Sequence, residues 1–117
     1  MFKFENLAVW RKSIELIGFI DFVVKKFPKD EVYVLSSQIK RASDSIALNI
    51  AEGSQGQSNP EFSKFVGYAI RSAIEVVCCI HIAKTREIIS KEDFDKIYED
   101  CEVLIKMLQS LRITLNK

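Results

Sequence analysis

The feature that most constrains the fold of this sequence is an apolar seam between residues 62 and 83, which alternates steps of four and three. This alternation places its members on one stripe of an α-helix, as in coiled coils and helix bundles. Further apolar residues, at Ile70, Ile74, Val77 and Cys78, widen the stripe well beyond one face. The segment therefore predicts a long helix that is the most buried in its fold. The seam consists of Phe62, Val66, Ala69, Ala73, Val76, Ile80 and Ala83.

The segment before this helix carries a polar pattern. Gln38, Ala42, Ser45, Asn49 and Glu52 follow one another at helical spacing and form one line along a helix. An apolar line runs beside it, and serine and alanine occupy much of the remaining surface. Small side chains allow neighbouring elements to approach closely. We interpret the polar line as a buried hydrogen-bond register in a helix that is covered on more than one side.

Breaker residues set the limits of the first two helices. The first is predicted from Leu7 to Phe27, where Pro28 ends it. The second begins near Asp30 and ends at Gly53, whose missing Cβ suits a left-handed cap. The inner stripe of the first helix is predicted to consist of Leu7, Trp10, Ile14, Ile17 and Val24.

Capping signals begin the other two helices. Asn59 followed by Pro60 starts the third, and Ser90 with Asp93 resembles a capping box before the fourth. Short connections between long helices favour antiparallel neighbours. The prediction is an all-α, antiparallel up-down-up-down four-helix bundle, with residues 1–117 forming a single domain. The seam of the fourth helix is predicted to run through Phe94, Ile97, Cys101, Leu104, Leu108, Leu111 and Leu115.

Composition narrows the functional classes. The 117 residues include 17 basic and 16 acidic side chains, a net charge of +1, whereas a strongly electrostatic nucleic-acid binder is usually clearly basic. No signal peptide is recognisable, and no stretch approaches the roughly 20 apolar residues of a membrane span. Three cysteines, two of them adjacent, do not form a disulfide framework. We expect a cytoplasmic protein that does not enter a membrane.

The residues offer little for catalysis or metal binding. His81 is the only histidine, whereas a bundle di-metal site needs paired Glu-x-x-His motifs on two helices. The three cysteines lack zinc-site spacing, and no serine–histidine–acid arrangement is apparent. We therefore expect a protein that is not an enzyme and has no cofactor, metal or small-molecule substrate.

One polar cluster admits two interpretations. It consists of Gln38, Arg41, Asn49, Glu52, Ser72 and Glu75, from the second and third helices. The functional interpretation is an acidic site for a metal or a general base. The structural interpretation has Arg41 neutralising Glu52 and Glu75 while Asn49 caps or bridges backbone groups, since a half-buried carboxylate must be paired. We favour the structural interpretation because no second catalytic group accompanies the cluster.

Basic residues are concentrated in the first two helices, and acidic residues in the fourth. The net charge of +1 therefore hides a polarised surface. The alternatives are solvated helix faces or contacts to the phosphates of RNA or DNA. The candidate phosphate-binding residues are Arg11, Lys12, Lys25, Lys26, Lys29 and Lys40.

The polar line is part of a resemblance to a known family. Residues 38–53, with Gln38, Arg41, Ser45 and the run Asn49-Ile50-Ala51-Glu52-Gly53, resemble the signature of four-helix bundle proteins encoded in intervening sequences of bacterial 23S ribosomal RNA genes. The likeness covers nearly the whole chain. Other matching positions include Leu7-Ala8-Val9-Trp10, Lys12, Phe27-Pro28, Glu31, Tyr33, Leu35, Glu61-Phe62, Phe65, Ala69, Ser72 and Glu75.

The resemblance implies a ring-like homopentamer. The sequence itself also predicts that subunits associate, because the first three helices carry more apolar and small-residue surface than one bundle buries. Phe19, Phe22 and the outer side of the third helix are the candidate interface. The leading functional hypothesis is a nucleic-acid-associated accessory or scaffold protein. The alternatives are a structural ring for protein–protein interaction and an unrecognised enzyme.

Overall fold

The computed structural model describes residues 1–56 and 58–117, and within them the chain is all-α. No strand occurs in these residues, so the prediction of an all-α protein with four long helices is confirmed. Two short 3-10 helices, η1 (Lys3–Asn6) and η2 (Lys29–Glu31), precede α1 and α2. The four α-helices are α1 (Ala8–Val24), α2 (Leu35–Ser54), α3 (Asn59–Thr85) and α4 (Lys91–Leu115).

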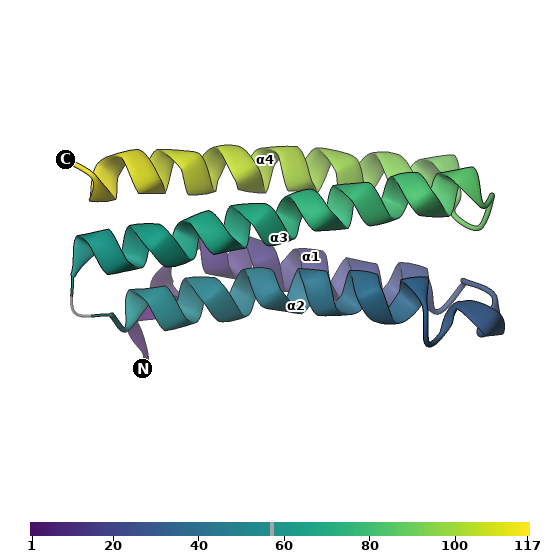
Figure 1. Ribbon diagram of the computed structural model, residues 1–117, viewed down its shortest axis with the longest axis horizontal. Helices are drawn as coiled ribbons and strands as arrows, with labels where there is room; N and C mark the ends of the chain where they lie inside the picture. The colour runs from purple at the N-terminus through teal and green to yellow at the C-terminus, as the bar shows by residue number, and fades with distance from the viewer. Residues whose placement is uncertain (57) are drawn as a thin grey trace.

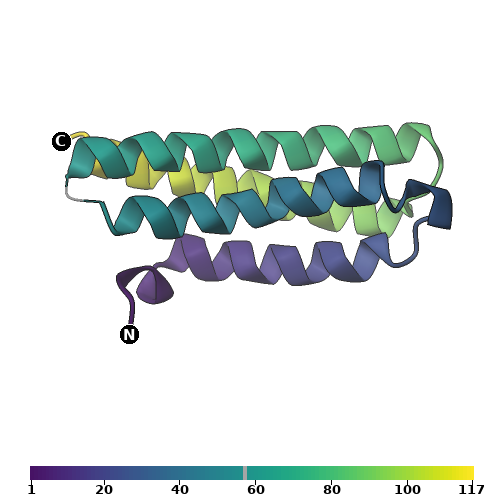
Figure 2. The same cartoon turned by 60° about the horizontal axis from the view of Figure 1, so that its bottom comes forward.

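The α-helices lie side by side along the longest dimension of a body of 44 × 22 × 19 Å (Figure 1). The α1–α2 and α3–α4 connections lie at one end, while the α2–α3 connection and both termini lie at the other (Figures 1 and 2). Within the described residues, α1 and α3 each pack closely against both α2 and α4, whereas the backbones of the diagonal pairs α1/α3 and α2/α4 stay apart. The α2–α3 groove is therefore on the opposite side of the bundle from the α1–α4 groove.

Side-chain caps define where α3 and α4 begin. The hydroxyl of Ser58 accepts a hydrogen bond from the backbone N–H of Glu61 at 3.3 Å, so the cap is Ser58 and the prediction of Asn59 was wrong by one residue. Asn59 is instead the first helical residue, and Pro60 follows it in the first turn. The hydroxyl of Ser90 accepts from the N–H of Asp93 at 3.1 Å, which confirms the predicted start of α4.

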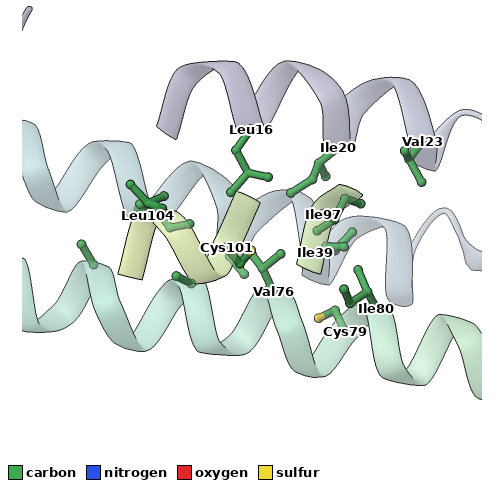
Figure 3. Packing of buried hydrophobic residues seen from close by; sticks show 14 of the residues in the cluster. Leu16, Ile20, Val23, Ile39, Val76, Cys79, Ile80, Ile97, Cys101 and Leu104 are labelled. Carbon is green, nitrogen blue, oxygen red and sulfur yellow. The ribbon is translucent and has the colours of Figure 1, made fainter. Parts of the chain in front are cut away.

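The core fills the space between the four helices (Figure 3). All seven predicted seam residues of α3 are buried. Five of the seven predicted in α4 are buried, and Leu111 and Leu115 are partly buried against the core. The α4 seam was predictable because it is a single apolar stripe with mostly polar flanks. The α3 seam was predictable because its spacing is unbroken over seven positions.

The predicted inner stripe of α1 was wrong in phase. Ile14 is 42 % exposed, and the residues that face the core are Val9, Ser13, Leu16, Ile20 and Val23. Two apolar stripes run along this helix, so spacing alone did not separate them. Ser13 also looked like a surface residue. It is buried because its hydroxyl donates to the Trp10 carbonyl at 2.6 Å, which satisfies it locally.

The prediction that α3 is the most buried helix was also wrong. Ten of the 20 residues of α2 are buried, against nine of the 27 residues of α3. By length and composition, α3 is the one helix in the described residues that is long and apolar enough to cross a membrane. The expectation that no stretch of the sequence approaches the length of a membrane span was therefore too strong. A core helix of a bundle meets the same two criteria. The extra apolar residues of α3 lie partly or fully on its outer side, where Ile74 and Cys78 are exposed.

Gly53 serves a different purpose from the predicted cap. None of the glycines in the described residues has a positive φ, and Gly53 lies within α2, one residue before its end. A Cβ added at Gly53 would lie 2.6 Å from the Cβ of Phe65 and 3.1 Å from the ring of Phe62. The residue is therefore needed for the close approach of α2 to the first turns of α3.

We expect Gly53→Ala to destabilise the fold by about 1–3 kcal/mol, because the added methyl group overlaps the backbone-anchored Cβ of Phe65. The matched control is Gly18→Ala in α1, where an added Cβ meets nothing within 4 Å. This substitution should stabilise by about 0.5–1 kcal/mol through helix propensity. Urea unfolding followed by circular dichroism measures both changes, and equal effects of the two variants would contradict the packing role of Gly53.

Candidate functional site

The polar cluster surrounds an open hollow of about 570 Å³ between α2 and α3. Four of its six predicted members line this hollow, namely Gln38, Arg41, Ser72 and Glu75. Asn49 and Glu52 are not among the lining residues. The sequence interpretation missed several other lining residues. Two of them, Tyr33 and Ser37, precede the predicted Arg41 at steps of four, so extending the helical spacing backward from Arg41 would have identified them. The missed residues are Tyr33, Val34 and Ser37, whereas Ala42 and Ser45 belong to the predicted polar line and also line the hollow.

Three of the small polar side chains form one hydrogen-bonded chain that joins α2 to α3. The hydroxyl of Ser72 donates to the hydroxyl of Ser45 at 2.9 Å. The Nδ2 of Asn49 donates to the Ser45 carbonyl at 2.8 Å and to its hydroxyl at 2.9 Å. Asn49 thus bridges a backbone group, as the structural interpretation expected. All three residues are half-buried, so this chain fixes the register of the two helices.

The charged members of the cluster are exposed in the subunit. Arg41, Glu52 and Glu75 are all exposed, as is Gln38, so for these residues the predicted buried register was wrong. The five ion pairs recorded over residues 1–56 and 58–117 include none of the three charged residues. The predicted neutralisation by Arg41 is therefore absent within one chain. The physical reason is that α2 packs only against α1, α3 and the 3-10 helices, which leaves this line uncovered.

The six candidate phosphate-binding residues do not act as one set. Lys12 pairs with Asp100 at 3.4 Å, and Lys26 pairs with Asp93 at 2.9 Å, so α4 neutralises both. The other four are exposed and make no ion pair with another described residue. One of them is partly engaged, since the guanidinium of Arg11 donates to the Asn6 carbonyl at 3.3 Å. The four are Arg11, Lys25, Lys29 and Lys40.

A second open hollow, of about 600 Å³, lies between α1 and α2. Lys25 and Lys40 line it together with Arg41, and Asp21 and Asp44 are the acidic residues of its wall. Tyr33, Ser37 and Arg41 line both hollows, so the two are separated by a ridge of α2 and the turn before it. The sequence interpretation did not identify this second hollow.

The predicted interface residues of α1 lie on the other side of the bundle. Phe22 is 53 % exposed and its ring lies 6.0 Å from that of Phe19, between centroids. The ammonium of Lys96, from α4, lies 5.0 Å from the centre of the Phe19 ring, and Lys26 lies 4.3 Å from the centre of the Phe22 ring. Phe19 is therefore half-covered by α4, and Phe22 is the more open of the two.

Histidine and cysteine are placed for packing. The exposed His81 ring meets Phe94 edge-on with 5.1 Å between centroids. Burial raises the pKa of the Cys79 thiol to about 11 and that of Cys101 to about 12, so both remain protonated near neutral pH and are poor metal ligands. Within residues 1–56 and 58–117, no three His, Cys, Asp or Glu side chains gather closely enough to hold a metal ion.

Comparison with known proteins gives a matching family and a similar solved structure. A family model described as 23S rRNA-intervening sequence protein matches residues 5–110. A solved structure from Bacteroides thetaiotaomicron VPI-5482, described as a protein of unknown function from the S23 ribosomal protein family, is 28 % identical and superposes with a TM-score of 0.77. That alignment covers 90 % of this chain and 98 % of the other. The comparison with curated proteins found no match.

We expect Asn49→Leu to lower the stability of the folded chain by about 1–3 kcal/mol, because the Ser45 hydroxyl and carbonyl both lose a donor. Glu75→Ala is the matched comparison from the same cluster. It removes an exposed side chain without a recorded partner, so it should leave the unfolding of the subunit unchanged and act only on association. Thermal unfolding and light scattering separate the two effects. Full stability of Asn49→Leu would contradict the structural role.

Proposed function

Because the chain belongs to the 23S rRNA-intervening sequence protein family, we propose that it is a non-enzymatic antiparallel bundle that works as a homo-oligomeric ring. The observation that carries this proposal is the uncovered outer surface of α2 and α3, here called the α2–α3 face. Mixed apolar and charged surface of this kind marks sites of protein association. The residues that define the face are Val34, Gln38, Arg41 and Glu75, which line the hollow, and Leu48, which lies two turns after Arg41 on the same side of α2.

The α2–α3 face has both components of an association surface. Its apolar component is Leu48, which is 66 % exposed, and Val34, which is 53 % exposed. Arg41 and Glu75 line the same hollow with opposite charges and no ion pair to another described residue. A neighbouring subunit would supply both the apolar cover and the missing counter-charges.

A ring requires two different contact surfaces on each subunit, because its interfaces are heterologous. The second surface is the α1–α4 side with Phe22, which is opposite the α2–α3 groove in the order of packed helices. Two unlike apolar surfaces on opposite sides favour a head-to-tail ring over a two-fold dimer. The number of five subunits is taken from the family resemblance. Connections at alternate ends of the bundle support the antiparallel up-down-up-down order (Figure 1).

Nucleic-acid binding by this ring is the second part of the proposal. Its support is the set of exposed basic residues without an ion pair, namely Arg11, Lys25, Lys29 and Lys40. A ring would repeat these weak contacts several times along one RNA or DNA strand, and repeated contacts on one polymer act together. We place the protein in the cytoplasm, with no cofactor. The alternative is a structural ring for protein–protein interaction without a nucleic-acid role.

We expect light scattering to give about 67 kDa for five chains of 13.4 kDa each at micromolar concentration. Leu48→Glu and Phe22→Glu should each dissociate or aggregate the ring, because each places a charge in a dry contact. Ile113→Glu is the matched control, since this α4 residue is 65 % exposed and outside both surfaces. A monomeric wild type, or equal dissociation by Ile113→Glu, would refute the proposed assembly.

We expect titration with single-stranded and duplex RNA and DNA to show weak sequence preference and strong dependence on salt. The log–log slope should be roughly 0.7–0.9 per phosphate neutralised. Charge reversal at Lys25 together with Lys40 should abolish binding and leave the oligomer intact. Lys26 is unsuitable for this test because its reversal would place a carboxylate beside Asp93. Absence of binding to all four polymers at low salt would leave the protein-interaction ring as the better account.

A further inference from the structure

One end of the α3–α4 pair carries basic residues and no acidic ones. Neither residues 62–74 of α3 nor residues 103–117, from α4 to the C-terminus, include an Asp or Glu. Figure 1 shows α3 and α4 side by side, with the start of α3 and the C-terminus at the same end. The basic residues are all exposed, and none forms an ion pair recorded over residues 1–56 and 58–117. They are Lys64, Arg71, Lys106, Arg112 and Lys117.

The acidic residues that flank these segments do not neutralise this end. Glu75 lies on the other side of α3, where it lines the hollow shared with α2. Glu61 turns toward the α2–α3 connection, since its carboxylate oxygen lies 3.1 Å from the Cβ position of Gly56. Glu102 precedes Gln109 by two turns of α4. The end of the pair beyond Glu102 therefore keeps its positive charge, although the whole chain has a net charge of only +1.

Arg112 is held in place on this basic surface. Its Nε donates to the hydroxyl of Ser63 at 3.3 Å. A Cβ added at Gly67 would lie 3.0 Å from Cζ and Nη2 of Arg112 and 3.1 Å from Nη1, so the face of the guanidinium rests on α3 where no side chain stands. Neither Nη atom has an acceptor among the described residues. The two outer nitrogens can therefore bind a carboxylate from outside in the bidentate geometry.

The guanidinium lines an open hollow of about 510 Å³ between α3 and α4, together with two isoleucines and two amide side chains. Arg112 is the only charged residue among those that line it. Ile113 in this wall is 65 % exposed, and Ile74, one turn after the lining Ile70, is 55 % exposed. Exposed apolar residues on two adjacent helices beside a hollow form a groove that suits an amphipathic helix. This surface, here called the α3–α4 face, consists of Ile70, Ile74, Gln109, Arg112, Ile113 and Asn116.

We infer that the α3–α4 face binds an acidic amphipathic helix of a partner protein. Apolar side chains of this helix would fill the hollow and cover Ile74 and Ile113, while one of its carboxylates pairs with Arg112. The occupant is acidic because this end of the pair offers only positive charge. A nucleic acid would match the charge and leave the two isoleucines without an apolar contact. The inference goes beyond the proposed ring, whose two contact surfaces do not include this face.

Fluorescence anisotropy of a labelled synthetic peptide, titrated with the full chain, tests this inference. The peptide is a helix of about 16 residues, with leucines at steps of three and four and glutamates beside them. The matched control peptide has glutamine in place of every glutamate. We expect saturable binding of the acidic peptide and at least about tenfold weaker binding of the control, which lacks the charged acceptors. Equal binding of the two peptides, or no binding of either, would overturn the inference.

Substitutions in the chain locate the contact. Arg112→Gln should weaken binding of the acidic peptide about tenfold and remove its advantage over the control peptide. Lys84→Gln removes an exposed charge from the other end of the same two helices and should not. Gly67→Ala should weaken binding several-fold by displacing the guanidinium, yet keep or raise the melting temperature through its better helix propensity. A glycine needed only for folding would not give this combination, and unchanged binding by both Arg112→Gln and Gly67→Ala would contradict the assigned contact.

Ile113→Glu separates this surface from the subunit contacts of the ring. It should abolish peptide binding, because it places a carboxylate against those of the peptide, and leave the mass in light scattering unchanged. A fall in mass would show that a second copy of the chain covers the face and would overturn the inference. Displacement of the peptide by a single-stranded oligonucleotide of equal charge would overturn it in favour of phosphates. The face lies within one chain, so peptide binding by a monomeric wild type would support the inference while refuting the ring.

Discussion

The packing of α2 against α3 is the contact on which the rest of this structure depends. At one end, Gly53 allows the helices to approach until Phe62 and Phe65 touch the α2 backbone. Further along, the Ser72–Ser45 hydrogen bond fixes the register between them. α1 and α4 then complete the bundle by packing on the far sides of this pair, and the backbone of each stays apart from that of the helix diagonally opposite. The close approach leaves one side of the pair with no further helix to cover it, and this side is the α2–α3 face.

The parts of the fold that sequence predicted well are those in which one pattern dominates. The seam of α3 keeps its alternation through seven positions, and the capping serine of α4 precedes a clear apolar stripe, so each has one interpretation. α1 carries two apolar stripes, and the correct one includes Ser13, a residue that counts as polar in any pattern. Its hydroxyl is satisfied within one turn of helix, a local detail that spacing does not reveal.

The candidate site shows a different limit of sequence patterns. The polar line of α2 was interpreted as buried, and within one chain Ser45 and Asn49 are half-buried while Gln38, Arg41 and Glu52 are exposed. Small and apolar flanks indicate that a surface is covered, but they do not distinguish cover by the same chain from cover by another. The second hollow was missed for a related reason. It depends on α1 and α2 packing side by side, which brings together residues that no spacing in the sequence relates.

The two hollows share a ridge, so the α2–α3 face is not electrostatically independent of the rest of the subunit. Arg41 lines both, with Glu75 in the wall of one and Asp44 in the wall of the other. A single guanidinium cannot hold its full set of hydrogen bonds in both directions at once. A neighbouring subunit on the α2–α3 face would draw Arg41 toward that face and away from Asp44. Assembly would therefore change the charge in the second hollow as well as cover the first.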